Sequence, residues 1–212
     1  MTSDQLLERI FDADRQADAA ENELLQAQPA SLATCLRRAT DVAIGLQEPP
    51  ERIRRLRRLA DLSAQVPSGE MIDNLITILD SEEAVTRLHA GEALLDVAYE
   101  RYADFARGVE RLLQRAHKGP CMSELPFVVA EIGEPSAVAL ISGFLNLDDS
   151  EAVASAIEAL AVVGDPAARP YLEPLLNDQR TVTLHDEQDE PMVRIAELAA
   201  EALEALSAEQ LP

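Results

Sequence analysis

Apolar residues recur along most of this chain at helical spacing, in runs separated by short polar breaks. Within residues 150–163, for example, Val153, Ala156, Ile157 and Leu160 lie three or four positions apart, on one face of an α-helix. The same kind of spacing predicts about eleven helices, at residues 3–28, 30–46, 51–66, 70–79, 83–99, 102–117, 122–132, 135–147, 150–163, 166–176 and 191–206. Because most breaks are only a few residues long, each helix is expected to turn back against the next.

Two of these breaks carry the same signal. Gly133-Glu134-Pro135 recurs as Gly164-Asp165-Pro166, thirty-one positions later. Glycine just past a helix end can adopt the left-handed conformation, the acidic residue can cap the next helix, and proline fits a first turn. A further break at residues 146–150 is rich in residues that cap helix N-termini. One unit is therefore helix, tight turn, helix, at the period of two-helix solenoid repeats.

Two segments, 151–166 and 191–206, resemble the bacterial HEAT-type repeat, which is also seen in phycobilin-lyase accessory subunits. The family pattern is roughly Asp-x-x-x-Val-Arg-x-x-Ala-x-x-Ala-Leu-x-x-Ile-Gly-Asp-Pro. Val193-Arg194 keeps its Val-Arg pair, whereas Val153 is followed by Ala154. The match is good over residues 130–207, fair over 70–100 and weak before 67. The resemblance implies a bacterial protein with an all-α, right-handed α-solenoid of stacked antiparallel helix pairs, built for docking rather than for one reaction.

The array is expected to form a single continuous domain with two parts. Residues 67–212 form the HEAT-like repeat solenoid, and residues 1–66 form N-terminal helices that are divergent repeats or a cap. The first of these helices carries Leu6, Ile10 and Leu24 at helical spacing, a stripe typical of an amphipathic helix.

Composition agrees with helices. The chain has no Trp and only 3% aromatic residues, so the strands of a sandwich or barrel are not expected, while 47% hydrophobic residues suffice for a continuous core. The longest apolar runs span a few residues, far short of a bilayer, and the first residues lack the features of a signal peptide. We therefore expect a cytoplasmic protein that does not enter a membrane.

The net charge of the chain limits the kinds of partner that it is expected to bind. The net charge is −21, and because residues 1–66 carry eleven acids against nine arginines, −19 of it falls on residues 67–212. Such a surface repels phosphate backbones and anionic lipid heads, so direct binding to nucleic acid or membrane is not expected. The charge either keeps the protein dispersed or attracts another protein with a basic surface.

No motif in the sequence indicates catalysis, a cofactor or a metal. Cys35 and Cys121 are eighty-six positions apart, and His89, His117 and His185 lie in different segments without a paired spacing. Nucleophile elbows and glycine-rich phosphate loops are also missing. The prediction is a protein that is not an enzyme, with no cofactor and no metal site.

The predicted partner surface is the concave, acidic face lined by the second helices of the repeats. On the helices at 150–163 and 191–206, its expected contacts are Glu151, Ser155, Glu158, Arg194, Glu197 and Glu201. A long break at 177–191 is read as a surface loop that stability does not require, which reaches the same partner through Asp186, Glu187, Asp189 and Glu190. Its acidic spacing does not fit an EF-hand calcium loop.

A run of arginines is the second candidate surface. It comprises Arg52, Arg54, Arg55, Arg57 and Arg58, on the helix at 51–66. The run is either a solvated helix face paired with neighbouring acids, which we favour, or a docking patch for an acidic partner or nucleic acid. Since aromatic residues and lysines do not accompany it, the nucleic-acid version is the weaker one.

Three functions fit these features. The first, our main prediction, is a non-enzymatic interaction module or scaffold that binds a protein partner through its acidic concave surface. The second is a regulatory inhibitor or antitoxin-like protein that mimics a polyanion on a basic target. The third, taken from the resemblance, is an accessory subunit of a bilin-lyase-like enzyme.

Overall fold

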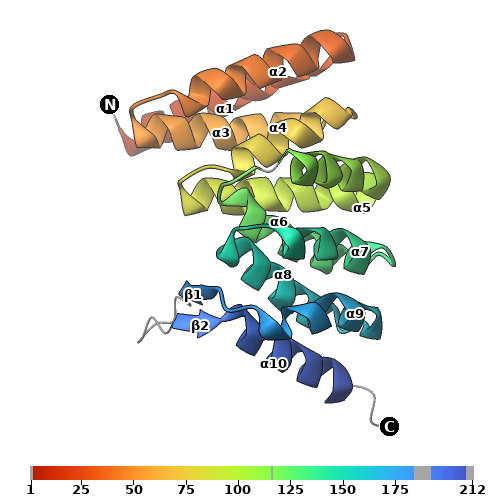
Figure 1. Ribbon diagram of the computed structural model, residues 1–212. Helices are drawn as coiled ribbons and strands as arrows, with labels where there is room; N and C mark the ends of the chain where they lie inside the picture. Colours follow the sequence, from red (N-terminus) through yellow and green to blue (C-terminus); the bar gives the residue numbers. More distant parts are fainter. Residues whose placement is uncertain (1, 116, 184–191, 209–212) are drawn as a thin grey trace.

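The computed structural model describes residues 2–115, 117–183 and 192–208, in which the helices form a stack that begins with α2 and ends with α10 (Figure 1). The α-helices are α1 Ser3–Leu25, α2 Pro29–Ile44, α3 Pro49–Ala64, α4 Gly69–Leu79, α5 Ala84–Gln114, α6 Cys121–Ile132, α7 Ala137–Ser142, α8 Ser150–Val163, α9 Arg169–Leu172 and α10 Ile195–Ala208. Short 3-10 helices and two strands complete these ranges: η1 Gly143–Asn146, η2 Pro166–Ala168, η3 Glu173–Asn177, β1 Thr181–Thr183 and β2 Met192–Arg194.

One apolar core runs through the stack from α2 to α10. Leu36 of α2, Leu75 of α4, Phe105 of α5, Ile141 of α7 and Leu160 of α8 are all buried in it. From α2 onward, each helix packs mainly on its neighbours in the chain or on the next helix but one, as α6 does on α8 and α8 on α10. The predicted all-α solenoid is confirmed, since burial in a solenoid comes from stacking one unit on the next.

The glycine stops have the conformation that the sequence predicts. Gly133 ends α6 with φ 67°, and Gly164 ends α8 with φ 70°. The Asp165 carboxylate accepts a hydrogen bond from the backbone N–H of Ala167 at 2.8 Å, as a cap should. Glu134 makes no such cap, because α7 begins only at Ala137.

The helices predicted at 83–99 and 102–117 are joined into α5. At Arg101 the backbone leaves helical geometry, with φ −141° and ψ 51°, so α5 is kinked where the sequence predicts a boundary. In the described ranges the chain therefore has ten α-helices instead of about eleven.

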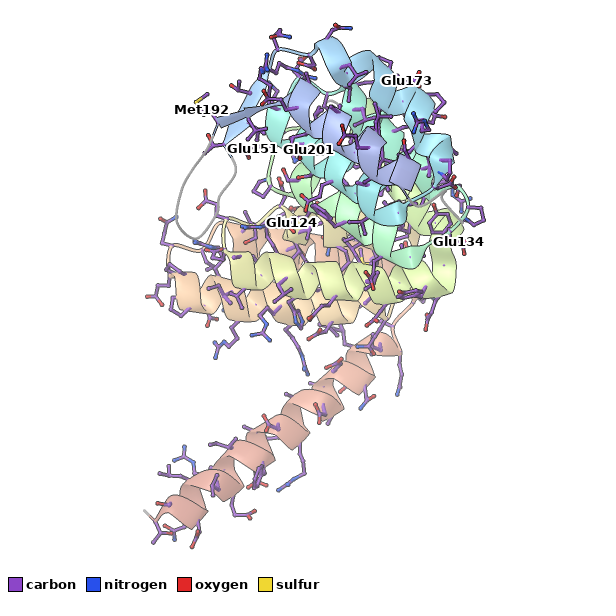
Figure 2. All side chains as sticks on the ribbon, turned by 90° about the horizontal axis from the view of Figure 1, so that it is seen from below. Glu124, Glu134, Glu151, Glu173, Met192 and Glu201 are labelled. Atoms are coloured by element: carbon purple, nitrogen blue, oxygen red, sulfur yellow. The ribbon has the colours of Figure 1, made fainter. Side chains whose placement is uncertain are left out.

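Helix α1 does not bury its apolar stripe. Leu6, Ile10 and Phe11 are 44%, 55% and 48% exposed, and no residue of α1 is buried. Only its last turn, at Leu24 and Leu25, is partly buried against the core. Figure 2 shows α1 projecting away from the other helices. Helical spacing predicts an apolar face here, but it does not specify what covers that face.

The break after η3 contains an antiparallel β-hairpin, which the sequence does not predict. Val182 of β1 pairs with Val193 of β2, and Val182 is only 7% exposed. The predicted helix at 191–206 therefore begins late, at Ile195, and residues 181–183 are not a dispensable surface loop. The segment that leads into the hairpin also supplies acceptors for the free backbone N–H groups at the start of α10. Ile195 N–H donates to the Arg180 carbonyl at 2.9 Å, and Ala196 N–H donates to the Asp178 carbonyl at 3.2 Å.

Among the described residues, no helix is long and apolar enough to cross a membrane.

Candidate functional site

A groove of about 660 Å³ lies between α8 and α10. Both helices pack directly on each other, and β1 and α6 contribute further residues to the lining. Small side chains at Ala154, Ala161 and Ala205 leave the space open, while Ile157 and Leu198 make much of the remaining lining apolar. The groove can therefore hold a side chain or a short segment of another molecule.

Three exposed carboxylates line this apolar groove. Glu151 and Glu158 come from α8 and Glu201 from α10, with the Ser155 hydroxyl between the two α8 positions. Figure 2 shows Glu151 and Glu201 beside each other on this part of the molecule. The seven-residue interval from Glu151 to Glu158 is two helical turns, which explains why both face the same side of α8.

None of these three carboxylates has a cationic partner among the residues that the structure describes. Arginines near the groove are occupied elsewhere: Arg180 pairs with Asp178 at 2.6 Å, and Arg87 with Glu124 at 3.0 Å. The hydrogen bond from Arg180 also lowers the pKa of Asp178 below its usual value. Among the described residues, no cation therefore compensates the negative charge of the groove.

The structure brings together four of the six helix residues predicted as partner contacts. Glu151, Ser155, Glu158 and Glu201 line the groove. Arg194 lies in β2 rather than in a helix, and its guanidinium pairs with Glu197 at 2.6 Å, outside the groove lining. Hydrogen bonds from Arg194 lower the pKa of Glu197. These two residues neutralise each other.

The acidic residues predicted at the tip of the long break, Asp186, Glu187, Asp189 and Glu190, lie outside the described residues. Their part in binding stays a prediction. The described ends of this break belong to the hairpin, and Val182 and Thr183 line the groove.

Most of the arginine run on α3 is paired with acids. Arg52 pairs with Glu83 and donates to the Leu46 carbonyl at 2.6 Å. Further pairs join Arg54 and Arg55 to Glu51, and Arg58 to Glu21 of α1. In the part of the chain that the structure describes, Arg57 makes no ion pair. A docking patch would therefore have to be assembled from arginines that already neutralise other charges.

Three groove residues that lie outside α8 and α10 are not among the predicted partner contacts. Ser123 lies in α6, one repeat before the groove, and Val182 and Thr183 lie in β1, a strand that the sequence does not predict. The alternation of Thr181-Val182-Thr183 was the available signal for the strand, but three residues are too few to distinguish it from a loop.

Comparisons with known proteins return engineered proteins, among them designed armadillo repeat proteins, at low similarity. No family model and no curated protein matches the chain. An engineered protein is 18% identical, with 93% of each chain covered and a TM-score of 0.38. A designed armadillo repeat protein is 16% identical over 88% of this chain and 98% of its own, with a TM-score of 0.35. A computationally designed armadillo repeat protein, made for modular peptide recognition, is 15% identical with a TM-score of 0.32. TM-scores this low do not establish the fold, so the all-α solenoid is assigned from the helices of the chain itself.

Proposed function

We propose that this protein is a non-enzymatic interaction scaffold whose α8–α10 groove binds a basic segment of another protein. The observation that carries the proposal is the set of unpaired carboxylates, Glu151, Glu158 and Glu201, around an apolar lining. Unpaired charges at the rim of a groove favour a partner of opposite sign, since they gain an ion pair without first losing one.

The chemistry of the groove fits lysine and arginine side chains. Their methylene stems cover apolar surface while the charged head stays near water and acids. Ala154 and Ile157 offer that apolar surface between the carboxylates of α8. A net charge of −21 would also steer a basic partner toward the protein and repel nucleic acid and anionic lipid.

The finer parts of this proposal rest on the sequence pattern. We take the repeats to be of the bacterial HEAT type, on the match at residues 151–166, with residues 67–212 as the repeat array and residues 1–66 as its divergent end. A cytoplasmic, bacterial scaffold agrees with that pattern and with the acidic composition. The groove offers carboxylates and hydroxyls, which suit the binding of cationic side chains, so the proposal includes no catalytic step.

A capture experiment with charge-matched variants tests the proposal. Immobilised protein would be exposed to cell lysate, and the bound proteins quantified by mass spectrometry. The groove variant is Glu151→Gln/Glu158→Gln/Glu201→Gln. Its control neutralises three exposed glutamates outside the groove, Glu100, Glu110 and Glu173, so both variants change the net charge from −21 to −18.

We expect a small set of basic proteins to bind the parent and the control variant and to be lost from the groove variant. Three exposed ion pairs of about 0.2–1 kcal/mol each make the expected loss of affinity roughly tenfold. If both variants lose the bound basic proteins equally, net charge alone accounts for the binding. If both retain them equally, the partner surface lies outside the groove.

A further inference from the structure

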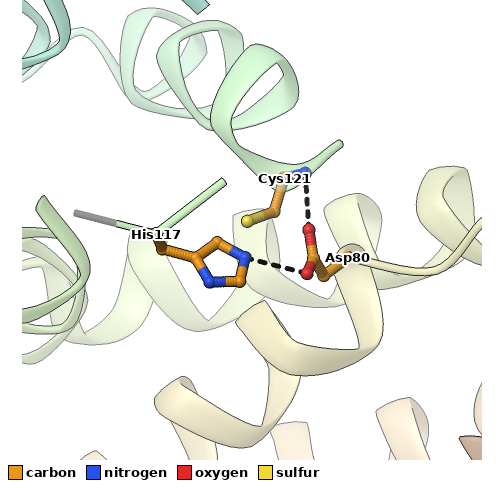
Figure 3. A group of neighbouring side chains, drawn as sticks. All are labelled: Asp80, His117 and Cys121. Carbon is orange, nitrogen blue, oxygen red and sulfur yellow. Dashed lines mark hydrogen bonds and ion pairs between the residues drawn. The ribbon is translucent and has the colours of Figure 1, made fainter. Parts of the chain in front are cut away.

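A second cluster of polar side chains lies away from the groove, where α4, the segment before α6, and α6 meet (Figure 3). It comprises Asp80, which follows α4, His117, and Cys121, the first residue of α6. One donor atom from each, a carboxylate oxygen, a ring nitrogen and the sulfur, lie within 4.8 Å of one another. His117 Nε2 is 2.8 Å from Asp80 Oδ2. Spacing along the sequence does not indicate this cluster, because its three residues are of different types and come from separate segments.

The Asp80 carboxylate is held in place from its other side. Its Oδ1 accepts a hydrogen bond from the backbone N–H of Cys121 at 3.2 Å, which leaves Oδ2 directed at His117. The approach also depends on Gly119: a Cβ atom there would lie 2.2 Å from Asp80 Oδ1. Carboxylates that bind metals are commonly held in this way, with one oxygen hydrogen-bonded by a neighbouring group and the other free to face the ion.

The cluster is reachable from solvent at one side. Cys121 is fully buried, whereas the side chains of His117 and Asp80 are 35% and 24% exposed. All three line a cavity of about 370 Å³. The charged groups around that cavity are Arg37, Asp41, Glu70, Asp73 and Arg115, and Asp73 is paired with Arg111 at 2.7 Å. An ion can enter from this cavity and keep a water molecule on its open side.

We propose that Asp80, His117 and Cys121 bind one divalent ion of the zinc type. Sulfur, imidazole and carboxylate form a ligand set that Zn²⁺ accepts in tetrahedral geometry, with water as the fourth ligand. Magnesium and calcium prefer oxygen ligands alone, so the thiolate and imidazole select against them. On binding, the Cys121 thiol releases its proton to water, and the thiolate and carboxylate together balance the charge of the ion.

For the His117–Asp80 pair the rearrangement is small. The ion replaces the hydrogen bond between His117 Nε2 and Asp80 Oδ2, and those two atoms move from 2.8 Å to roughly 3.3 Å, the separation set by tetrahedral bonds of 2.0–2.1 Å. The Cys121 sulfur, which lies within 4.8 Å of both, completes the ligand set by closing on the same ion. Without an ion, the same residues form only a hydrogen-bonded clamp, in which Asp80 joins the end of α4 to His117 and to the start of α6. The experiment below distinguishes a metal site from this hydrogen-bonded clamp.

Cobalt(II) is the probe, because a cysteine thiolate bound to it gives a charge-transfer absorption that oxygen and nitrogen ligands do not. The full-length, untagged protein would be reduced, stripped with chelator, and titrated with Co²⁺ and then Zn²⁺. We expect one Co²⁺ per chain, a thiolate absorption that Zn²⁺ abolishes, and a higher melting temperature with Zn²⁺. His117→Gln and Cys121→Ser should each weaken binding by roughly tenfold or more.

The chain provides matched controls. Cys35 is an exposed cysteine, and His89 forms a similar pair with Asp61, at 2.7 Å, with no cysteine among the groups that bind it. Cys35→Ser and His89→Gln should bind Co²⁺ as the parent does. If Cys121→Ser fails to fold by circular dichroism, His117→Gln carries the test. A parent that gives no thiolate absorption, or a His117→Gln variant that binds undiminished, would leave only the hydrogen-bonded clamp.

Discussion

Leu160→Ala is the substitution that most sharply tests how the stack is held together. Leu160 has no exposed surface, and it lies on α8, which is packed between α6 on one side and α10 on the other. Two positions further along the same helix, Val162 is 71% exposed. The two side chains therefore share an element and differ in burial, so Val162→Ala is the natural control.

The magnitude follows from the buried volume. Leu160→Ala removes three carbon atoms from the core, about 2.4 kcal/mol of transfer free energy at about 0.8 kcal/mol each. Because α8 is fixed from both sides, the site cannot collapse fully, and the remaining cavity brings the total to about 2–5 kcal/mol. Val162→Ala loses little burial and gains a better helix former, so its free energy of unfolding should change by no more than about 0.5 kcal/mol.

Urea unfolding followed by far-ultraviolet circular dichroism measures both values, since the chain has no Trp to report by fluorescence. Native-state hydrogen exchange then locates the effect. Because each unit of a solenoid contacts its neighbours, Leu160→Ala should lower amide protection in α6, α8 and α10 more than in α2 and α3.

Equal unfolding free energies for Leu160→Ala and Val162→Ala would refute this reasoning. So would a loss of protection spread evenly over all helices, because the stack would then unfold as one unit without local neighbours.

Three further predictions concern single residues. Asn74→Ala removes the buried amide that donates to Ser63 Oγ at 3.0 Å, and urea unfolding should show a cost of about 1–3 kcal/mol. Gly133→Ala places a side chain at φ 67° with no atom within 4 Å to clash, so the same assay should show a conformational cost alone, of about 1–2 kcal/mol. The hydrogen bond from Arg52 lowers the pKa of Glu83, so its stabilisation is present above the usual carboxyl pKa and lost as the pH falls through the lowered one. In acid titrations, Glu83→Gln should therefore reduce the dependence of stability on pH below about pH 4.

Local signals in the sequence carry much of the fold. Spacing of apolar residues identifies the helices, and glycine identifies where two of them end, as Gly133 and Gly164 show. These features depend on residues a few positions apart. The kink at Arg101 was also marked, as a predicted boundary, although nothing local distinguishes a kink from a turn.

What the sequence missed depends on contacts between distant residues. The exposure of Phe11 on α1 depends on whether another element covers that stripe, and spacing carries no information on it. Val182 is buried because the hairpin folds back on α8. Glu151, Ser155 and Glu158, three of the predicted partner contacts, lie together because one helix carries them, and their part in binding stays a prediction. Arg194 was misplaced when the start of α10 proved to lie at Ile195.

The central claim, that the α8–α10 groove binds basic segments, is tested most directly by selecting a displayed library of random peptides on the parent protein. The selected peptides would then be titrated against the Glu151→Gln/Glu158→Gln/Glu201→Gln variant and its charge-matched control. The account predicts peptides rich in lysine and arginine, interleaved with apolar residues, that bind the groove variant roughly tenfold more weakly than the control. Selected peptides that are neutral or acidic, or that bind both variants equally, would contradict it.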